Sequence, residues 1–182
     1  MVITKLATLS LLFGISGLAG WAHAANKSPD KIAADVVRAG CSVSFLEEPL
    51  QDLHNPSSGP LFNVKATWQC RDGETLSIDN YEVNGSSPEV VTVFYWQKRE
   101  IVALVKWSVN SQAADYFGDY YQVFIYKYVC SSKGSKIMRD STAMKAFPEG
   151  WDGVKRDGTP VIYAFRDAAS IRKRLRAIQL GQ

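Results

Sequence analysis

The sequence predicts an α+β fold, in which an antiparallel β-meander of about six strands has an N-terminal and a C-terminal helix packed on it. Three observations favour this class. Residues 89–130 are dominated by β-branched and aromatic residues, which fit a pleated sheet and lose rotamer freedom in a helix. Turn-forming Gly, Pro, Asn and Asp residues divide the remaining chain into short segments. Residues 28–39 and 167–180 instead combine helix-capping residues with apolar residues at helical spacing.

Residues 1–24 have the pattern of a secretory signal peptide. Lys5 precedes an apolar run at 6–20, and Ala22-His23-Ala24 supplies the small residues of a cleavage site. An uncleaved N-terminal anchor is the alternative, but the run is short and Gly-rich for a membrane span. We therefore expect cleavage after Ala24, export to a bacterial periplasm, a single domain over residues 25–182, and no stable membrane insertion of the mature chain.

The charge of the chain is nearly balanced. The net charge is +3, and the signal peptide contributes only Lys5 to it. Such a chain has no overall field that would draw it to nucleic acid or to anionic lipid, so we expect no nucleic-acid partner. No Gly-rich phosphate loop or dinucleotide fingerprint follows a predicted strand, so we expect no cofactor.

Three cysteines remain in the mature chain, and an oxidising compartment favours one disulfide among them. If the segments on either side of the Pro-rich loop 49–60 pair as antiparallel strands, Cys41 faces Cys70. We therefore predict a Cys41–Cys70 disulfide, with Cys70–Cys130 as the competing pairing. Cys130 is then a free thiol, which we expect to be buried or at an interface rather than a nucleophile.

The first half of the mature chain predicts one helix and three strands. Ser28 caps the helix and Gly40 ends it. Residues 41–48 and 61–70 form a hairpin, and the turn at 71–73 leads to a third strand. The cross-strand pairs of this register are Val43 with Trp68, Phe45 with Ala66, Leu76 with Trp68, and Ile78 with Ala66.

A central hairpin follows the turn at 84–88. If Lys98 and Arg99 are its two loop residues, one face is uniformly apolar, although these residues suit a primed turn poorly and leave the register open to a shift. The other face is also largely apolar, so we expect a helix to cover it. The loop 110–119 leads to a Tyr-rich strand at 120–130 that can be half exposed. The predicted pairs are Trp96 with Ile101, Phe94 with Ala103, Thr92 with Val105, and Val90 with Trp107.

The C-terminal part is less regular until its last helix. We expect a polar loop at 131–136, a short helix at 138–147, turns at 148–153 and 156–158, and a short strand at 161–165. Asp167 caps the last helix, in which Ile171, Leu175 and Ile178 form an apolar stripe. The cations on the rest of this helix suit either the solvated face of a docking helix or a basic patch for an acidic partner or a membrane surface. They are Arg172, Lys173, Arg174 and Arg176.

The mature chain offers little for catalysis. Its single histidine, His54, lies in the Pro-rich loop, where little would hold it rigid, so we expect no catalytic triad. No cysteine or histidine pair has metal-ligand spacing, so we expect no metal site. Carboxylates could still form the acid and base of a glycosidase, although Glu47 and Glu48 would point to opposite faces of a strand. The candidates are Glu47, Glu48, Asp52, Asp115, Asp119 and Asp152.

Aromatic residues are abundant, with five Trp and eight Tyr in the chain. Rows of such residues on a sheet serve as core, as a carbohydrate platform or as a protein interface. We expect the partner-binding residues in the Pro-rich loop, in the loop 110–119 and on the Tyr-rich strand. The candidates are His54, Tyr116, Phe117, Tyr121, Tyr126 and Tyr128.

Four phrases together resemble a set of small uncharacterised exported proteins of proteobacteria. They are SPEVVTVFY at 87–95, GDYYQV at 118–123, GWDG at 150–153 and AASIRKRL at 168–175. The resemblance covers roughly the C-terminal half and carries over no catalytic residue. It implies a periplasmic protein of the immunity or inhibitor kind, which blocks toxins or lysozymes.

These observations favour a non-catalytic periplasmic module that binds a protein, such as an immunity protein or an inhibitor of an enzyme or toxin that targets the envelope or cell wall. One alternative is a glycan-acting hydrolase with paired carboxylates, which would need a cleft with two facing Asp or Glu side chains. The other is a structural or assembly subunit, which an exposed Tyr-rich edge strand would favour.

Overall fold

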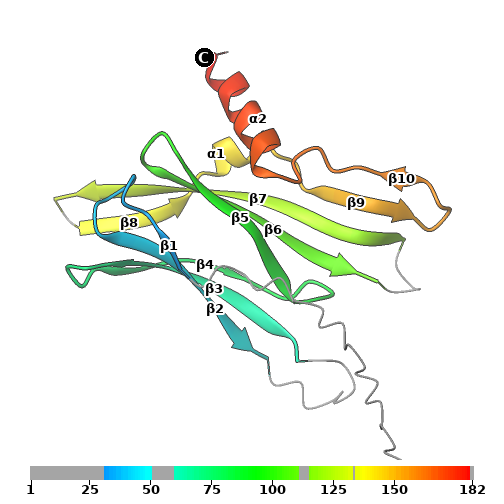
Figure 1. Ribbon diagram of the computed structural model, residues 1–182, viewed down its shortest axis with the longest axis horizontal. Coiled ribbons are helices and arrows are strands. Elements are labelled where there is room, and N and C mark those ends of the chain that lie inside the picture. The colour runs from blue at the N-terminus through cyan, green and yellow to red at the C-terminus, as the bar shows by residue number, and fades with distance from the viewer. Residues whose placement is uncertain (1–30, 51–59, 111–114, 133, 181–182) are drawn as a thin grey trace, which may run out of the picture.

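The computed structural model describes residues 31–50, 60–110, 115–132 and 134–180. They form two antiparallel sheets that stack face to face, with two helices on the outer face of the second sheet (Figure 1). The first sheet has the order β1-β2-β3-β4, and the second has the order β10-β9-β7-β6-β5, with β8 also paired to β7. The elements are β1 (Lys31–Ala33), β2 (Cys41–Pro49), β3 (Phe62–Cys70), β4 (Thr75–Tyr81), β5 (Pro88–Trp96), β6 (Glu100–Val109), β7 (Tyr116–Ser131), β8 (Gly134–Arg139), α1 (Ser141–Met144), β9 (Gly150–Lys155), β10 (Pro160–Val161) and α2 (Ala168–Leu180).

The predicted class agrees with this architecture at a coarse level, because antiparallel sheet dominates and helices are few. The described strands form two stacked sheets, however, and not a single meander. Alternate residues of β6 and β7 point to opposite faces of the second sheet, and both faces are buried. The core between the sheets includes Val43, Trp68, Tyr81, Ile101, Phe124 and Tyr126, and the core beneath the helices includes Phe94, Val102, Leu104, Ile125, Ile171 and Leu175.

The hairpin of β2 and β3 has the predicted register. Cys41 lies opposite Cys70, and a disulfide joins them. Cys130 is a free cysteine, but its side chain is exposed rather than buried, because it lies near the end of β7 beside the turn into β8. The pairs Val43–Trp68, Phe45–Ala66 and Leu76–Trp68 are confirmed.

A bulge changes the last predicted pair of the first sheet. The register of β3 and β4 shifts between Ala66 and Thr67, so Asp79 rather than Ile78 lies opposite Ala66. Ala66 is buried between the two sheets. The shift therefore turns the carboxylate of Asp79 toward the second sheet.

The predicted register of the central hairpin is wrong by one residue. The loop has three residues rather than two, and Gln97 and Lys98 both adopt left-handed conformations, with φ of 48° and 60°. Tyr95 rather than Trp96 therefore faces Ile101, and the shift exchanges the faces of the strand. The other pairs change as well: Phe94 faces Val102, Thr92 faces Leu104, Val90 faces Val105 beyond a bulge, and Trp107 faces Pro88.

The predicted N-terminal helix is wrong over its described part. The chain there forms β1, with Lys31 opposite Ser44 of β2, and then tight turns at 35–40 that begin with two N–H groups donating to the carbonyl oxygen of Ala34. So short a helix is marginal without tertiary support, whereas the edge of β2 offers a complete set of strand partners. Residues 28–30 lie outside the described part.

The C-terminal half contains more strand than predicted. β7 begins inside the predicted loop 110–119, β8 lies in and beyond the predicted loop 131–136, and β9 takes the place of the predicted turn at 148–153. Of the predicted helix 138–147, only α1 forms. Of the predicted strand 161–165, only Val161 is in a strand, as the last residue of β10. The cause is the length of β7, which has 16 residues, because β9 and β8 pair with its first and second halves.

The C-terminal helix forms where the sequence predicts it. The carboxylate of Asp167 accepts a hydrogen bond from the backbone N–H of Ser170 at 2.7 Å, which caps the helix. Ile171 and Leu175 are buried against the second sheet, and Ile178 packs on the same core.

Removal of the disulfide should destabilise this fold. The bond joins cysteines separated by 29 positions, and a cross-link over such a loop stabilises a protein by about 3–4 kcal/mol by restricting the unfolded chain. We expect the Cys41→Ser/Cys70→Ser variant to lose about 3 kcal/mol of unfolding free energy in urea titrations, and Cys130→Ser to lose less than about 0.5 kcal/mol. An equal loss from Cys130→Ser would contradict this disulfide assignment.

Candidate functional site

Four aromatic rings form a row on the inner face of the second sheet, where β6, β7 and β9 run side by side. Trp107 lies opposite Tyr120, and Tyr120 lies opposite Trp151, with ring centroids 6.2 Å and 5.1 Å apart. Tyr116 stacks on Trp151 at 4.9 Å, with the two ring planes 7° apart. We call Trp107, Tyr120, Trp151 and Tyr116 the aromatic row.

The row leads from the core to the surface. Trp107 is buried, and its Nε1 donates a hydrogen bond to the carbonyl oxygen of Glu82 at 2.8 Å. The other three rings are partly exposed. Among the described elements, β9 packs against β7 and β10 and makes no comparable contact with the first sheet (Figure 1). The described strands of the first sheet therefore cover the row only at its Trp107 end.

Two glycines lie beside the stacked rings of Tyr116 and Trp151. Gly118 and Gly153 are opposite each other in the β7–β9 pair, and their φ angles of 138° and 154° favour glycine. A Cβ added to Gly118 would lie 2.3 Å from the carbonyl oxygen of Asp152. Close backbone contact thus replaces side chains here, and no side chain from this pair separates the two rings.

A shallow groove of about 650 Å³ adjoins the aromatic row. The end of β4 and the residues that follow it, 79–84, form one wall, and Trp107, Gln122 and Phe124 contribute from the second sheet. The guanidinium of Arg139 also lines the groove and lies 5.3 Å from the centroid of the Phe124 ring. Because Trp107 belongs to both, the groove adjoins the buried end of the row.

A polar network holds the wall of the groove in place. The Tyr126 hydroxyl donates to the carboxylate of Asp79 at 2.5 Å and lies 3.0 Å from the Tyr81 hydroxyl. Arg139 donates two hydrogen bonds to the same carboxylate, at 2.7 Å and 2.6 Å. Burial raises the pKa of both tyrosines, so both hydroxyls remain protonated donors. The side chains beside the groove are therefore fixed before any partner arrives.

The row also carries an acidic group. A hydrogen bond links Tyr120 to Glu149. Burial is the main cause that raises the pKa of the Tyr120 hydroxyl, and this hydrogen bond raises it further. Glu149 is exposed. The aromatic surface thus has a carboxylate acceptor at its margin.

Two of the predicted contact residues are wrongly placed on the surface. Tyr121 and Tyr126 are only 8% and 0% exposed. The reason is that β7 is an interior strand, paired with β6 on one side and with β9 and β8 on the other, and not an exposed edge. β7 therefore gives no support to the alternative that the protein is an assembly subunit with an exposed Tyr-rich edge strand.

The other predicted contact residues lie in different places. Tyr116 belongs to the aromatic row, whereas its neighbour Phe117 is on the other face of β7 by the alternation of the strand and is partly exposed. The Tyr128 hydroxyl accepts a hydrogen bond from Arg38 at 2.8 Å and lies 2.9 Å from the Ser135 hydroxyl, so it serves to join the two sheets. His54 lies outside the described residues.

Sequence reasoning did not bring Tyr120 and Trp151 together. It assigned residues 150–153 to a turn, whereas they form a strand that pairs with β7. The available signal was the glycines, because a glycine between strand-forming residues marks the close approach of another backbone. Gly118 and Gly153 meet this description.

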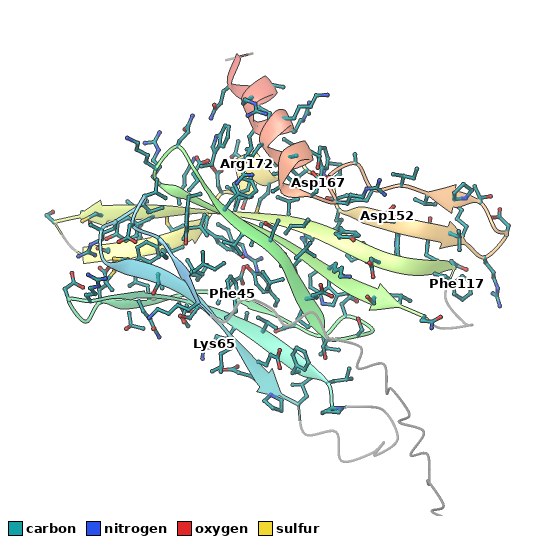
Figure 2. The ribbon with its side chains drawn as sticks, viewed as in Figure 1. Phe45, Lys65, Phe117, Asp152, Asp167 and Arg172 are labelled. Atoms are coloured by element: carbon teal, nitrogen blue, oxygen red, sulfur yellow. A yellow bond between two sulfur atoms is a disulfide. The ribbon has the colours of Figure 1, made fainter. Side chains whose placement is uncertain are left out.

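Two of the predicted carboxylates meet on the outer face of the second sheet. Asp119 and Asp152 are directly opposite each other in the β7–β9 pair. Figure 2 labels Asp152 on β9, the strand that lies beside the start of α2. The ammonium of Lys106 lies 3.2 Å from Asp119, and the guanidinium of Arg166 lies 3.2 Å from Asp152. Both carboxylates thus act as ion-pair partners. Of the other candidates, Glu47 and Asp115 are exposed, Glu48 pairs with Lys65 at 3.2 Å, and Asp52 lies outside the described residues.

A pocket of about 330 Å³ between the β5–β6 hairpin and the helices holds two further carboxyl groups. Glu100 is 8% exposed, and burial raises its pKa against the effect of Lys127, whose Nζ is 3.9 Å away. Burial also acts to raise the pKa of Asp140, but hydrogen bonds from Lys127 and from the backbone of Ala143 outweigh it, so this pKa is lowered. Lys127 and the cap of α1 account for both groups, and we treat the cluster as structural.

Comparison with known proteins finds no match among protein-family models, curated proteins or solved structures. Among the residues that the structure describes, no group of three or more His, Cys, Asp or Glu side chains is placed to hold a metal ion. Within the same part of the chain, no helix is long and apolar enough to cross a bilayer. On geometry, the aromatic row with its groove is the candidate functional site.

Substitution of Gly118 should disrupt the aromatic row. We expect Gly118→Ala to lower the free energy of unfolding by about 2 kcal/mol or more, because its Cβ would collide with backbone. Gly134→Ala is the matched control, since Gly134 has a φ of 117° but open space around it, and should cost about 1 kcal/mol. Equal losses in denaturant titrations would show that the close contact has no effect of its own.

Glu100 and Asp140 should respond to pH with opposite signs. The pKa of Glu100 is raised above its ordinary value of 4.5, so this group loses its proton at a lower pH in the unfolded chain than in the folded chain. The free energy of unfolding therefore falls as pH rises past 4.5. Glu100→Gln should therefore gain stability relative to the wild type from pH 4 to pH 7. Asp140→Asn should lose stability over the same range, because the lowered pKa of Asp140 stabilises the fold once pH exceeds its ordinary value of 3.8. Thermal unfolding at the two pH values tests both signs, and a parallel response would contradict them.

Proposed function

We propose that this chain is a non-catalytic binding protein of an oxidising, extracytoplasmic compartment, and that the aromatic row with its groove holds a protein partner. The observation that carries the proposal is the group of three partly exposed rings in contact, those of Tyr116, Tyr120 and Trp151, on a face that the described strands leave open. The disulfide supports the oxidising compartment, and the predicted signal peptide supports export to the periplasm.

Tyr and Trp are the residue types that most often dominate the binding energy of protein interfaces. They bury a large area with few rotatable bonds, so ordering them costs little entropy. In this row each ring is already in contact with another ring, and Trp107 is fixed by its hydrogen bond to Glu82. The surface is therefore preorganised, which lowers the cost of association.

The groove supplies the polar contacts that an interface needs around its aromatic centre. Arg139 and Gln122 line it, and Glu149 stands at the margin of the row. Such a combination of donors, an acceptor and rings is typical of a protein interface. We propose an enzyme or toxin that targets the envelope or cell wall as the partner, the class that the resemblance to small exported proteins implies.

The first test starts from the chain purified after export. A partner captured from periplasmic extract would be purified, and its affinity for the chain measured by calorimetry. We expect Tyr116→Ala and Trp151→Ala each to weaken binding about thirtyfold or more, because truncation of an aromatic anchor costs about 2 kcal/mol or more. Ile162→Ala is the control, since Ile162 is an exposed apolar residue outside the row, and should change the affinity less than about twofold.

Stability must be measured beside affinity, because Trp151 also packs on two neighbouring rings. If both row variants remain folded and bind the partner as the wild type does, the row is not the interface. If the row instead binds purified cell-wall oligosaccharides and no protein, the aromatic surface is a carbohydrate platform and the protein-binding proposal fails.

A further inference from the structure

Within the described residues, one end of the fold carries exposed cations that belong to none of the ion pairs there. α2 contains no acidic residue, and Lys173, Arg174 and Arg176 on it are exposed. Lys98 and Arg99 are exposed at the tip of the β5–β6 hairpin, and Arg99 lines the same pocket as the C-terminal half of α2. We call these five residues the basic patch.

The patch is confined to elements that project from the fold. α2 and the β5–β6 hairpin tip extend from the outer face of the second sheet, on the side away from β1–β4 (Figure 1). Figure 2 places Arg172 at this helix, where its guanidinium lies 4.2 Å from the centroid of the Phe94 ring. Arg172 thus helps to seat α2 on β5, and the five patch residues remain available to solvent.

Described acidic side chains do not neutralise the patch. The ion pairs of the described residues use other cations, such as Lys106, Lys127 and Arg166. The carboxyl group nearest in sequence, Glu100, is buried and is faced by Lys127, Arg99 and Asp140. The five side chains therefore present their charge outward, although the whole chain is nearly balanced.

The patch also differs from a protein interface in what it lacks. The exposed large apolar side chains of the described residues lie elsewhere, at Val36, Leu46, Leu50, Val91, Met138, Val154 and Ile162. A protein interface normally has an apolar or aromatic centre, whereas a fluid anionic surface needs only flexible cations on a projecting element. The apolar stripe of α2 is occupied by the core, so this helix cannot insert its own apolar face into a bilayer.

We propose that the basic patch docks the protein reversibly on an anionic phospholipid surface. Lys and Arg side chains near such a surface each strengthen binding about fivefold, and the attraction fades within a Debye length. The aromatic row lies on the inner face of the same sheet and the patch on its outer side, so both can be occupied together. The proposal goes beyond the proposed function and does not depend on the partner of the row.

Vesicle sedimentation with the full purified chain tests this inference. We expect binding to vesicles of phosphatidylglycerol mixed into phosphatidylcholine, none to phosphatidylcholine alone, and release at about 1 M salt, where the Debye length falls to about 3 Å. The variant Lys173→Gln/Arg174→Gln/Arg176→Gln should bind about a hundredfold more weakly. A second variant, Lys98→Asn/Arg99→Gln, should lose about twenty-fivefold, and Asn suits the left-handed backbone at position 98.

The control removes three exposed cations from other elements, as Lys31→Gln/Lys136→Gln/Lys155→Gln. It should stay within about threefold of the wild type, although the change in net charge is the same as in the α2 variant. Equal losses in control and patch variants, no preference for phosphatidylglycerol, or unchanged binding by the patch variants would each overturn the proposal. Tighter binding to duplex DNA or to an acidic protein than to the vesicles at the same salt would overturn lipid as the occupant. Circular dichroism confirms that each variant is folded.

Discussion

The strands β6 and β7 are apolar on both faces, so other parts of the chain must pack on each face of the second sheet. Ile101 and Phe124 need one cover, and Val102 and Ile125 need another. The first sheet supplies the cover on the inner face, and the helices with the segment around Tyr163 supply it on the outer face. Burial of this apolar area is the main source of stability. β7 is longer than the part of it that the first sheet covers. Its first half extends beyond the first sheet, and the aromatic row forms on this half.

The two sheets are joined by polar contacts as well as by apolar packing. The bulge in β4 places Asp79 between the sheets, where Tyr126 and Arg139 of the second sheet bind its carboxylate. An unpaired carboxylate at this depth would be costly, so the network specifies how the sheets are stacked as long as all its members are present. The bulge and the network therefore fix the width of the groove beside the row.

The sequence was informative where a pattern was local and failed where distant segments compete. The Cys41–Cys70 disulfide is predictable because both cysteines lie at the open end of one hairpin, and the last helix is predictable because Asp167 caps it. The central hairpin slipped by one residue because the left-handed conformations of Gln97 and Lys98 cannot be read from residue types that rarely adopt them. The sequence pattern does not predict β1 and β9, because such short strands are stable only when paired with other strands. The same limit hid the aromatic row, since Tyr120 and Trp151 become neighbours only when β9 pairs with β7.

The positions of the two proposed surfaces have a consequence for function. The aromatic row is on the inner face of the second sheet and is held by ring contacts, so it suits a partner of defined shape. The basic patch is on the outer side and consists of flexible side chains, so it suits a surface without a defined shape. A protein that rests on a membrane through the patch would leave the row accessible to a second protein. Restricting both molecules to one surface raises their effective concentration, so a modest affinity at the row would suffice for capture.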